Sequence, residues 1–143
     1  MSDADTGRLT VEDRGEFSLV LASATMGLRP SYEAIDAIEK TLGCGAIDIA
    51  RKALAGTLSM GETAQVACEC VRAWGREVDD KGASGSNAVR IGHLIYDSPG
   101  GLHDALKTIA AMLSLVVTGG YTASGELKPA TTMKTTENPL VDG

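Results

Sequence analysis

Aromatic side chains are scarce in this 143-residue chain, which has one Trp, one Phe and three Tyr and is 3% aromatic in total. A core with so few rings must be built mainly from Ala, Leu, Ile and Val, which belong to the 43% of residues that are hydrophobic. Small side chains also let helices approach one another closely. Because the chain has the length of one ordinary domain, we expect a single core.

Basic residues are outnumbered by acidic ones. Lys and Arg number 13 against 19 Asp and Glu, which gives a net charge of −6 and a pI near 4.8. A polyanion would be repelled over most of such a surface, and no local basic patch is visible. The longest apolar run, residues 109–117, is too short to cross a bilayer. The sequence therefore predicts no nucleic-acid partner and no membrane partner.

Cysteine is also rare, and it occurs only at Cys44, Cys68 and Cys70. The odd number, with no apolar signal segment before it, favours a reducing cytosolic setting. Cys68 and Cys70 fall within an expected helix, where positions two apart point about 200° away from each other, so they cannot easily share a metal ion. We therefore expect no metal site, and we expect Cys70 to pack as a small apolar side chain.

Histidine, the side chain that titrates nearest neutral pH, occurs only at His93 and His103. Neither has a partner that would complete a catalytic constellation, and His103 beside Asp104 is interpreted as a solvated pair. The glycine-rich stretches lack the other residues of a phosphate loop or a dinucleotide fingerprint, and they are interpreted as helix ends. The sequence thus predicts no catalytic residue and no cofactor.

The only strand pattern in the chain precedes Pro30. Residues 1–13 are polar and acidic and are expected to be flexible. Residues 17–21 alternate apolar and polar side chains, which predicts a short strand, and residues 25–29 form a second extended piece. Because an isolated hairpin is marginal in water, this one should lie against helices.

Three helices are predicted to follow. The first begins after Ser31 and ends at Leu42, and the second covers residues 46–55, each closed by a glycine. The third starts at Ser59 and Glu62, which have the spacing of a capping box.

Apolar residues three and four positions apart mark the expected inner faces of these helices. Trp74, the lone tryptophan, is expected in the core, although its large amphipathic ring would also suit a partner-binding anchor. The predicted faces are Ile35, Ile38 and Leu42 in the first helix, Ile47, Ala50 and Leu54 in the second, and Met60, Ala64, Ala67, Val71 and Trp74 in the third.

Two more helices are predicted in the second half of the chain. Residues 75–86 are charged and then rich in Gly and Ser, and they are interpreted as a flexible loop. A short helix through about residue 96 follows, and the last helix carries an apolar stripe over residues 102–116. From residue 121 the Thr-rich sequence predicts a disordered tail.

The whole pattern predicts a mainly α fold. We expect a small helical domain of about five helices with a short N-terminal β-hairpin over residues 14–120, between the flexible residues 1–13 and the disordered tail 121–143.

Three stretches carry a resemblance to a known family: residues 15–21, residues 28–43 ending in IDAIEKTLG, and residues 53–59, ALAGTLS. They are similar to the gene transfer agent tail protein family, grouped with the tail assembly chaperones of long-tailed phages and also labelled tail tube proteins. The resemblance covers roughly residues 15–75, and it offers no catalytic motif to match. It implies a non-enzymatic protein, cytoplasmic in a bacterial host or associated with the virion, that binds the tape measure protein or tail tube subunits.

The resemblance leads to a hypothesis for the partner surface. Tape measure helices expose apolar stripes before the tube encloses them, and an alanine-rich groove could cover such stripes reversibly. We place this groove between the first and third helices and predict that Ile38, Leu42, Val71 and Trp74 bind the partner.

Two other functions stay open. The chain could be a structural tail component that polymerises with copies of itself as tube rings, although only residues 16–29 look like strands and tube proteins usually need a sizeable sheet. It could also be a small enzyme with an acidic site at Glu77, Asp79 and Asp80, but this cluster is interpreted as solvated charge in a loop.

Overall fold

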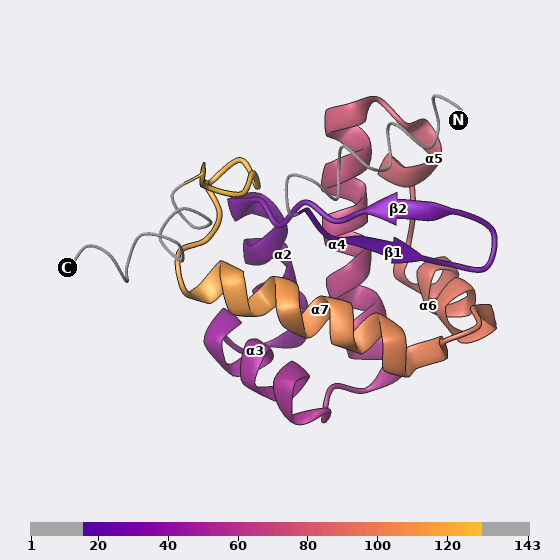
Figure 1. Ribbon diagram of the computed structural model, residues 1–143, viewed down its shortest axis with the longest axis horizontal. Helices are drawn as coiled ribbons and strands as arrows, with labels where there is room; N and C mark the ends of the chain where they lie inside the picture. The colour runs from indigo at the N-terminus through magenta and orange to yellow at the C-terminus, as the bar shows by residue number, and fades with distance from the viewer. Residues whose placement is uncertain (1–15, 130–143) are drawn as a thin grey trace, which may run out of the picture.

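A two-stranded sheet and six helices form the part of the chain that the computed structural model describes, residues 16–129 (Figure 1). The predicted mainly α fold with an N-terminal hairpin is confirmed. The elements are β1 (Ser18–Val20), β2 (Thr25–Gly27), α2 (Tyr32–Leu42), α3 (Ala46–Ala55), α4 (Met60–Val78), α5 (Lys81–Ser84), α6 (Ala88–Asp97) and α7 (Gly101–Val117).

The hairpin lies against the helices, as expected for so short a sheet. β1 pairs antiparallel with β2, and Leu19 stands opposite Met26. Both side chains are buried, and β1 contacts α7 while β2 contacts α4.

Local capping signals set the bounds of α2 and α3, which match the predicted helices. Ser31 Oγ accepts a hydrogen bond from the Ala34 N–H at 3.1 Å at the start of α2. Gly43 and Gly56 end the two helices in the left-handed conformation, which glycine adopts without strain.

α4 is the central helix of the fold and begins at the predicted capping box. Ser59 Oγ accepts from the Glu62 N–H at 3.0 Å, and Glu62 Oε1 accepts from the Ser59 N–H at 2.9 Å. The helix packs against α2, α5, α6, α7 and β2. Because it has neighbours on several sides, its buried residues extend beyond the single predicted stripe: Thr63, Ala64, Val66, Ala67, Cys68, Cys70, Val71, Ala73 and Gly75.

Residues 75–86 are mostly helical, so the predicted flexible loop is wrong. α4 continues into this segment until Asp79 ends it at a φ of 60°, and Asp80 caps α5 by accepting from the Ala83 N–H at 3.0 Å. Gly75 is buried where α5 folds back on α4, and a Cβ atom there would lie 2.7 Å from the Cβ of Ala83. Glycine here permits a close approach of two helices rather than a mobile loop.

The buried face of α3 also differs from the prediction. Ile47 and Leu54 are 58% and 64% exposed, whereas Ile49, Ala50 and Ala53 are buried. α3 packs on α7, a helix from the far end of the described chain. Because α3 has apolar residues on more than one side, only the position of α7 decides which of them are covered.

α6 and α7 follow at close to their predicted positions. The Asn87 side chain accepts from the Arg90 N–H at 2.8 Å at the start of α6, and α7 ends just before Thr118. Within residues 16–129 no single helix is long and apolar enough to cross a membrane. α6 and α7 reach that length only as a pair, which is bent by 119°.

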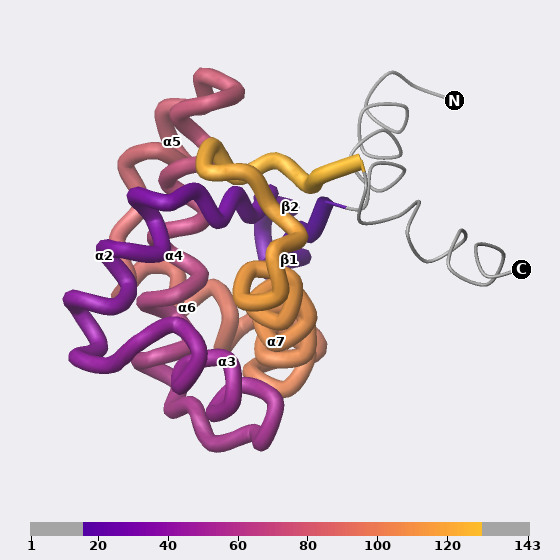
Figure 2. Tube along the Cα trace, turned by 90° about the vertical axis from the view of Figure 1, so that its left-hand side faces the viewer, coloured from indigo at the N-terminus to yellow at the C-terminus, as the bar shows by residue number. Residues whose placement is uncertain are grey.

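Residues 121–129, which the sequence assigned to a disordered tail, fold back beside the start of α2 (Figure 2). Tyr121 forms an isolated antiparallel bridge with Leu127. The Tyr32 N–H donates to the Ala123 carbonyl at 2.8 Å, and Arg29 Nε donates to the Ser124 carbonyl at 2.7 Å. The rest of the predicted tail and the predicted flexible residues 1–13 lie outside the described residues.

The core is aliphatic, as the composition predicts. Among residues 16–129 the largest fully buried side chains include no aromatic ring. They are Ile38, Ile49, Ile91, Ile95, Ile109, Met112, Leu113, Val66, Val71, Thr63 and Cys70.

Candidate functional site

The four residues predicted to bind a partner do not form an open groove. Ile38 and Val71 are 1% and 0% exposed, and they lie in the core where α2 packs on α4. Leu42 and Trp74 are half-buried and pack against that core. A partner could reach Ile38 and Val71 only if α2 and α4 separated, so these two side chains hold the fold together.

Trp74 packs mainly within the fold. Its indole lies over Gly27 of β2 so closely that no Cβ atom would fit at that glycine. It also lines a hollow of about 430 Å³ together with Arg29, Val78 and Leu127. Trp74 therefore has mainly the packing role that the sequence favours.

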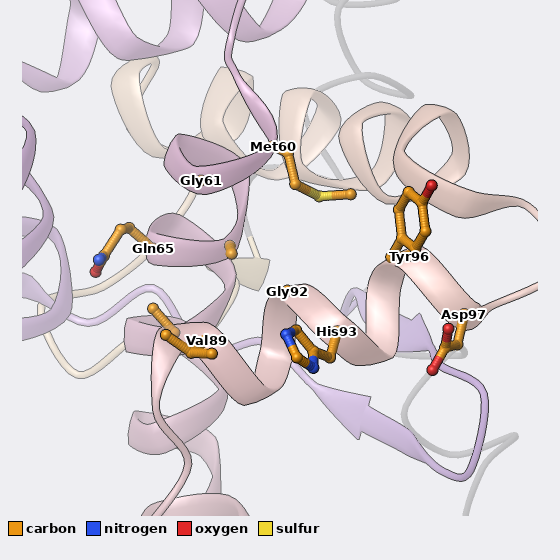
Figure 3. A pocket seen from close by; sticks show the side chains of 10 residues that line it. Met60, Gly61, Gln65, Val89, Gly92, His93, Tyr96 and Asp97 are labelled. Atoms are coloured by element: carbon orange, nitrogen blue, oxygen red, sulfur yellow. The ribbon is translucent and has the colours of Figure 1, made fainter.

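An apolar groove lies between α4 and α6 (Figure 3). It has a volume of about 450 Å³, and we call it the α4–α6 groove. Its lining comprises Met60, Gly61, Ala64, Gln65, Ala88, Val89, Gly92, His93, Tyr96 and Asp97.

Small residues make the floor of the α4–α6 groove. Gly92 of α6 faces Ala64 of α4, and a Cβ atom on Gly92 would lie 3.5 Å from the Ala64 Cβ, an ordinary contact distance. Gly61 and Ala88 continue the floor on either helix. Since none of these residues has a long side chain, the two helices pack closely and leave the space above them open.

Large apolar side chains flank this floor and face solvent. Val89 and Tyr96 on α6 are 70% and 77% exposed, one on each side of Gly92 along the helix. Met60 on α4 extends toward Tyr96 across the groove (Figure 3). Exposed apolar side chains that gather around one groove are what a binding site for an apolar partner requires.

The polar groups of the groove are few. Gln65, His93 and Asp97 lie at its margin. Asp97 is the last residue of α6, and no basic residue occupies the last turn of that helix. The carboxylate and the negative end of the helix dipole therefore coincide at one end of the groove.

The remaining candidates for chemistry have structural or solvated positions. His103 Nδ1 lies 3.7 Å from Asp104 Oδ1 with both side chains exposed, which confirms the interpretation as a solvated pair. Asp79 and Asp80 end and begin helices, as described above, and Glu77 Oε1 lies 3.7 Å from an Arg29 nitrogen. Within residues 16–129, no group of three or more His, Cys, Asp or Glu side chains is arranged to hold a metal ion.

The cysteines differ in accessibility. Cys70 is fully buried, and burial strongly raises the pKa of its thiol. Burial also raises the pKa of Cys68, whose Sγ lies 3.6 Å from the Ser86 carbonyl. Cys44 is half-buried near the end of α2.

These environments predict the order of thiol modification in the native protein. Because burial shields the Cys70 sulfur and raises the pKa of its thiol, the half-buried Cys44 should react first with an aromatic disulfide reagent, and Cys70 should react only when the chain unfolds. Mass spectrometry of labelled peptides over time checks this order. Labelling of Cys70 as fast as Cys44 would contradict the described burial.

A family model described as phage tail tube protein, GTA-gp10, matches residues 14–119. The match extends beyond the stretch on which the resemblance was based, and it includes the hairpin and the helices α2–α7. No curated protein and no solved structure gives a significant match.

Proposed function

We propose that this chain, which belongs to the phage tail tube protein, GTA-gp10, family, acts as a tail assembly chaperone. The family makes it a tail protein of a phage or gene transfer agent. The proposed activity is non-enzymatic: the protein holds an apolar segment of the tape measure protein, or of a tail tube subunit, in the host cytoplasm until the segment is assembled. The observation that supports it is the open α4–α6 groove.

A reversible holder needs an apolar surface that is exposed before the partner arrives. Val89 and Tyr96 meet this requirement because most of each side chain faces solvent in the folded chain. Their replacement should leave the core intact, since neither contributes a buried side chain. The groove therefore allows binding to be tested separately from folding.

We predict that the double variant Val89→Ser with Tyr96→Ser loses most of its binding to the partner. A few anchor side chains carry most of the binding energy of an interface, and truncating one of them costs about 2 kcal/mol or more. Val89 and Tyr96 are the large exposed side chains on either side of the floor and are therefore the expected anchors. Co-expression with the tape measure protein and with the tail tube subunit encoded nearby, followed by pull-down, measures the complex. The free energy of unfolding should stay within about 0.5 kcal/mol of the original value.

Leu54→Ser is the matched control. Leu54 is also a large apolar side chain, 64% exposed, but it lies on α3 away from the groove lining. It should leave complex formation unchanged. If neither candidate partner binds the folded original protein, the chaperone proposal fails.

A structural role in the tail tube is the second candidate. The description of the matching family as tail tube proteins favours it, and so does the outer edge of β1. The register leaves the backbone groups of Ser18 and Val20 on the side of β1 away from β2. A hollow of about 360 Å³ runs between this edge and residues 98–108. An edge of this kind can pair with a strand of another copy. Electron microscopy of the purified protein tests this: rings or tubes would support the structural role and argue against the chaperone.

A further inference from the structure

We propose that the α4–α6 groove receives an α-helix of a partner tail protein, with an apolar ridge toward the floor and a Lys or Arg beside Asp97. This inference rests on the proposed function, because it specifies what the chaperone holds. Three properties of the groove support it: its walls are helices, its floor residues are small, and one of its ends is negatively charged.

The backbone of the groove favours a helix over an extended segment. The walls are the first two turns of α4 and the length of α6. The backbone groups left unpaired at the helix ends point along the helix axes and not sideways into the groove, and the others bond within their own helix. The groove thus offers no main-chain partners to an added strand, whose own backbone groups would be left unpaired. A helix satisfies its backbone internally and presents only side chains.

The small residues of the floor allow another helix to approach α4 and α6 closely. Gly61 and Ala64 on α4, and Ala88 and Gly92 on α6, recur at spacings of three and four residues. These are the spacings of ridges and grooves on helix surfaces, so a third helix can place its side chains over the small residues. Val89 and Tyr96 then contact the sides of that helix.

The negative charge at one end of the groove indicates which side chains the bound helix should carry there. Asp97 adds a carboxylate to the negative end of α6, and no basic residue in the last turn of that helix compensates it. His93 and Tyr96 are the other titratable side chains of the lining. A Lys or Arg of the partner helix would therefore be favoured beside Asp97, and an acidic residue disfavoured.

The test uses a labelled synthetic helix of about 18 residues, with Leu at the spacing of one helical face and two Lys at one end. Fluorescence anisotropy measures its affinity for the full chain. Gly92→Leu should weaken binding more than about tenfold, because the new side chain occupies the floor. A peptide with Pro at its centre should not bind, since Pro breaks the helix. Leu54→Ser should bind as the original protein does.

If Gly92→Leu misfolds, reversing the charge at Asp97 and at the end of the peptide provides a second test. Asp97 is exposed, so Asp97→Lys should fold normally. It should weaken binding of the Lys-ended peptide about two- to fivefold and strengthen binding of an otherwise identical Glu-ended peptide by a similar factor.

Several outcomes would overturn the inference. Equal binding of the Pro-containing peptide, or no effect of either folded variant, would exclude a helix in this groove. A dimer of the original protein that Val89→Ser dissociates would make a second copy the occupant. Capture of the tape measure protein with no sensitivity to Gly92→Leu would reject the inference and leave the chaperone. Peptide binding as predicted without any tail protein complex would reject the chaperone alone.

Discussion

Replacing Ile38 with Ala is expected to lower the free energy of unfolding by about 2–5 kcal/mol. Ile38 is 1% exposed where α2 packs on α4, so the truncation removes apolar contacts and leaves a cavity. Such a loss is a large share of the stability of an ordinary domain, about 5–15 kcal/mol. Urea unfolding followed by circular dichroism measures it as a shift in midpoint at constant slope.

Ile47→Ala is the matched control for this experiment. Ile47 has the same side chain at the start of α3, but it is 58% exposed. Its truncation should change the free energy of unfolding by no more than about 0.5 kcal/mol. Equal losses for the two variants would contradict the described faces of α2 and α3. If Ile38→Ala lost partner binding with its stability unchanged, Ile38 would belong to the partner surface, as the sequence predicted.

Replacing Gly75 with Ala is expected to cost about 1–3 kcal/mol, even though Ala is the better helix former. The added Cβ would lie 2.7 Å from the Ala83 Cβ and 2.8 Å from the Ala83 carbonyl carbon. The second of these is a backbone atom of α5, so the clash is relieved only if the two helices move apart. Thermal unfolding by calorimetry should show the loss as a lower Tm.

Gly92→Ala separates this packing effect from helix propensity. Gly92 also lies inside a helix, but its added Cβ would meet the Ala64 Cβ at 3.5 Å, with no overlap. The variant should be more stable than the original protein by up to about 1 kcal/mol. If Gly75→Ala raises the Tm as much as Gly92→Ala does, α5 does not pack on α4 as described.

Local signals in the sequence were enough to place most elements. Ser31 and Ser59 each cap a helix within one turn of chain, and Gly43 ends α2 by its own backbone conformation. Such interactions join residues within a few positions of one another, so the sequence alone predicts them. The same holds for the hairpin, whose two strands are separated by one tight turn.

The errors arose where contacts between elements decide the outcome. Glycine and serine in residues 75–86 have the composition of a loop, but Gly75 instead serves the contact between α4 and α5. The covered side of α3 depends on α7, and the order of residues 121–129 depends on contacts with Arg29 and Tyr32. The contacts of α3 and of residues 121–129 join segments far apart in the sequence. The α4–α5 contact is local, and the cap at Asp80 is the signal for it that the composition obscured.

The α4–α6 groove was missed for the same reason. Val89, Gly92 and Tyr96 share a helical spacing, but the sequence does not say that this side of α6 lies beside the first turns of α4. The one signal in the sequence was that α6 has more apolar residues than one buried helical face can hold. Ile38 and Val71 were chosen instead because apolar periodicity identifies buried faces, and it does not distinguish a core from a docking surface.

Site-specific photo-cross-linking in cells that assemble tails tests whether the α4–α6 groove holds a partner. A benzophenone side chain is placed at Val89, inside the groove, or at Leu54, outside it, and mass spectrometry identifies the adducts. We predict an adduct with the tape measure protein or the tail tube subunit from position 89 and none from position 54. Adducts only from position 54, or only with further copies of this chain, would contradict the account.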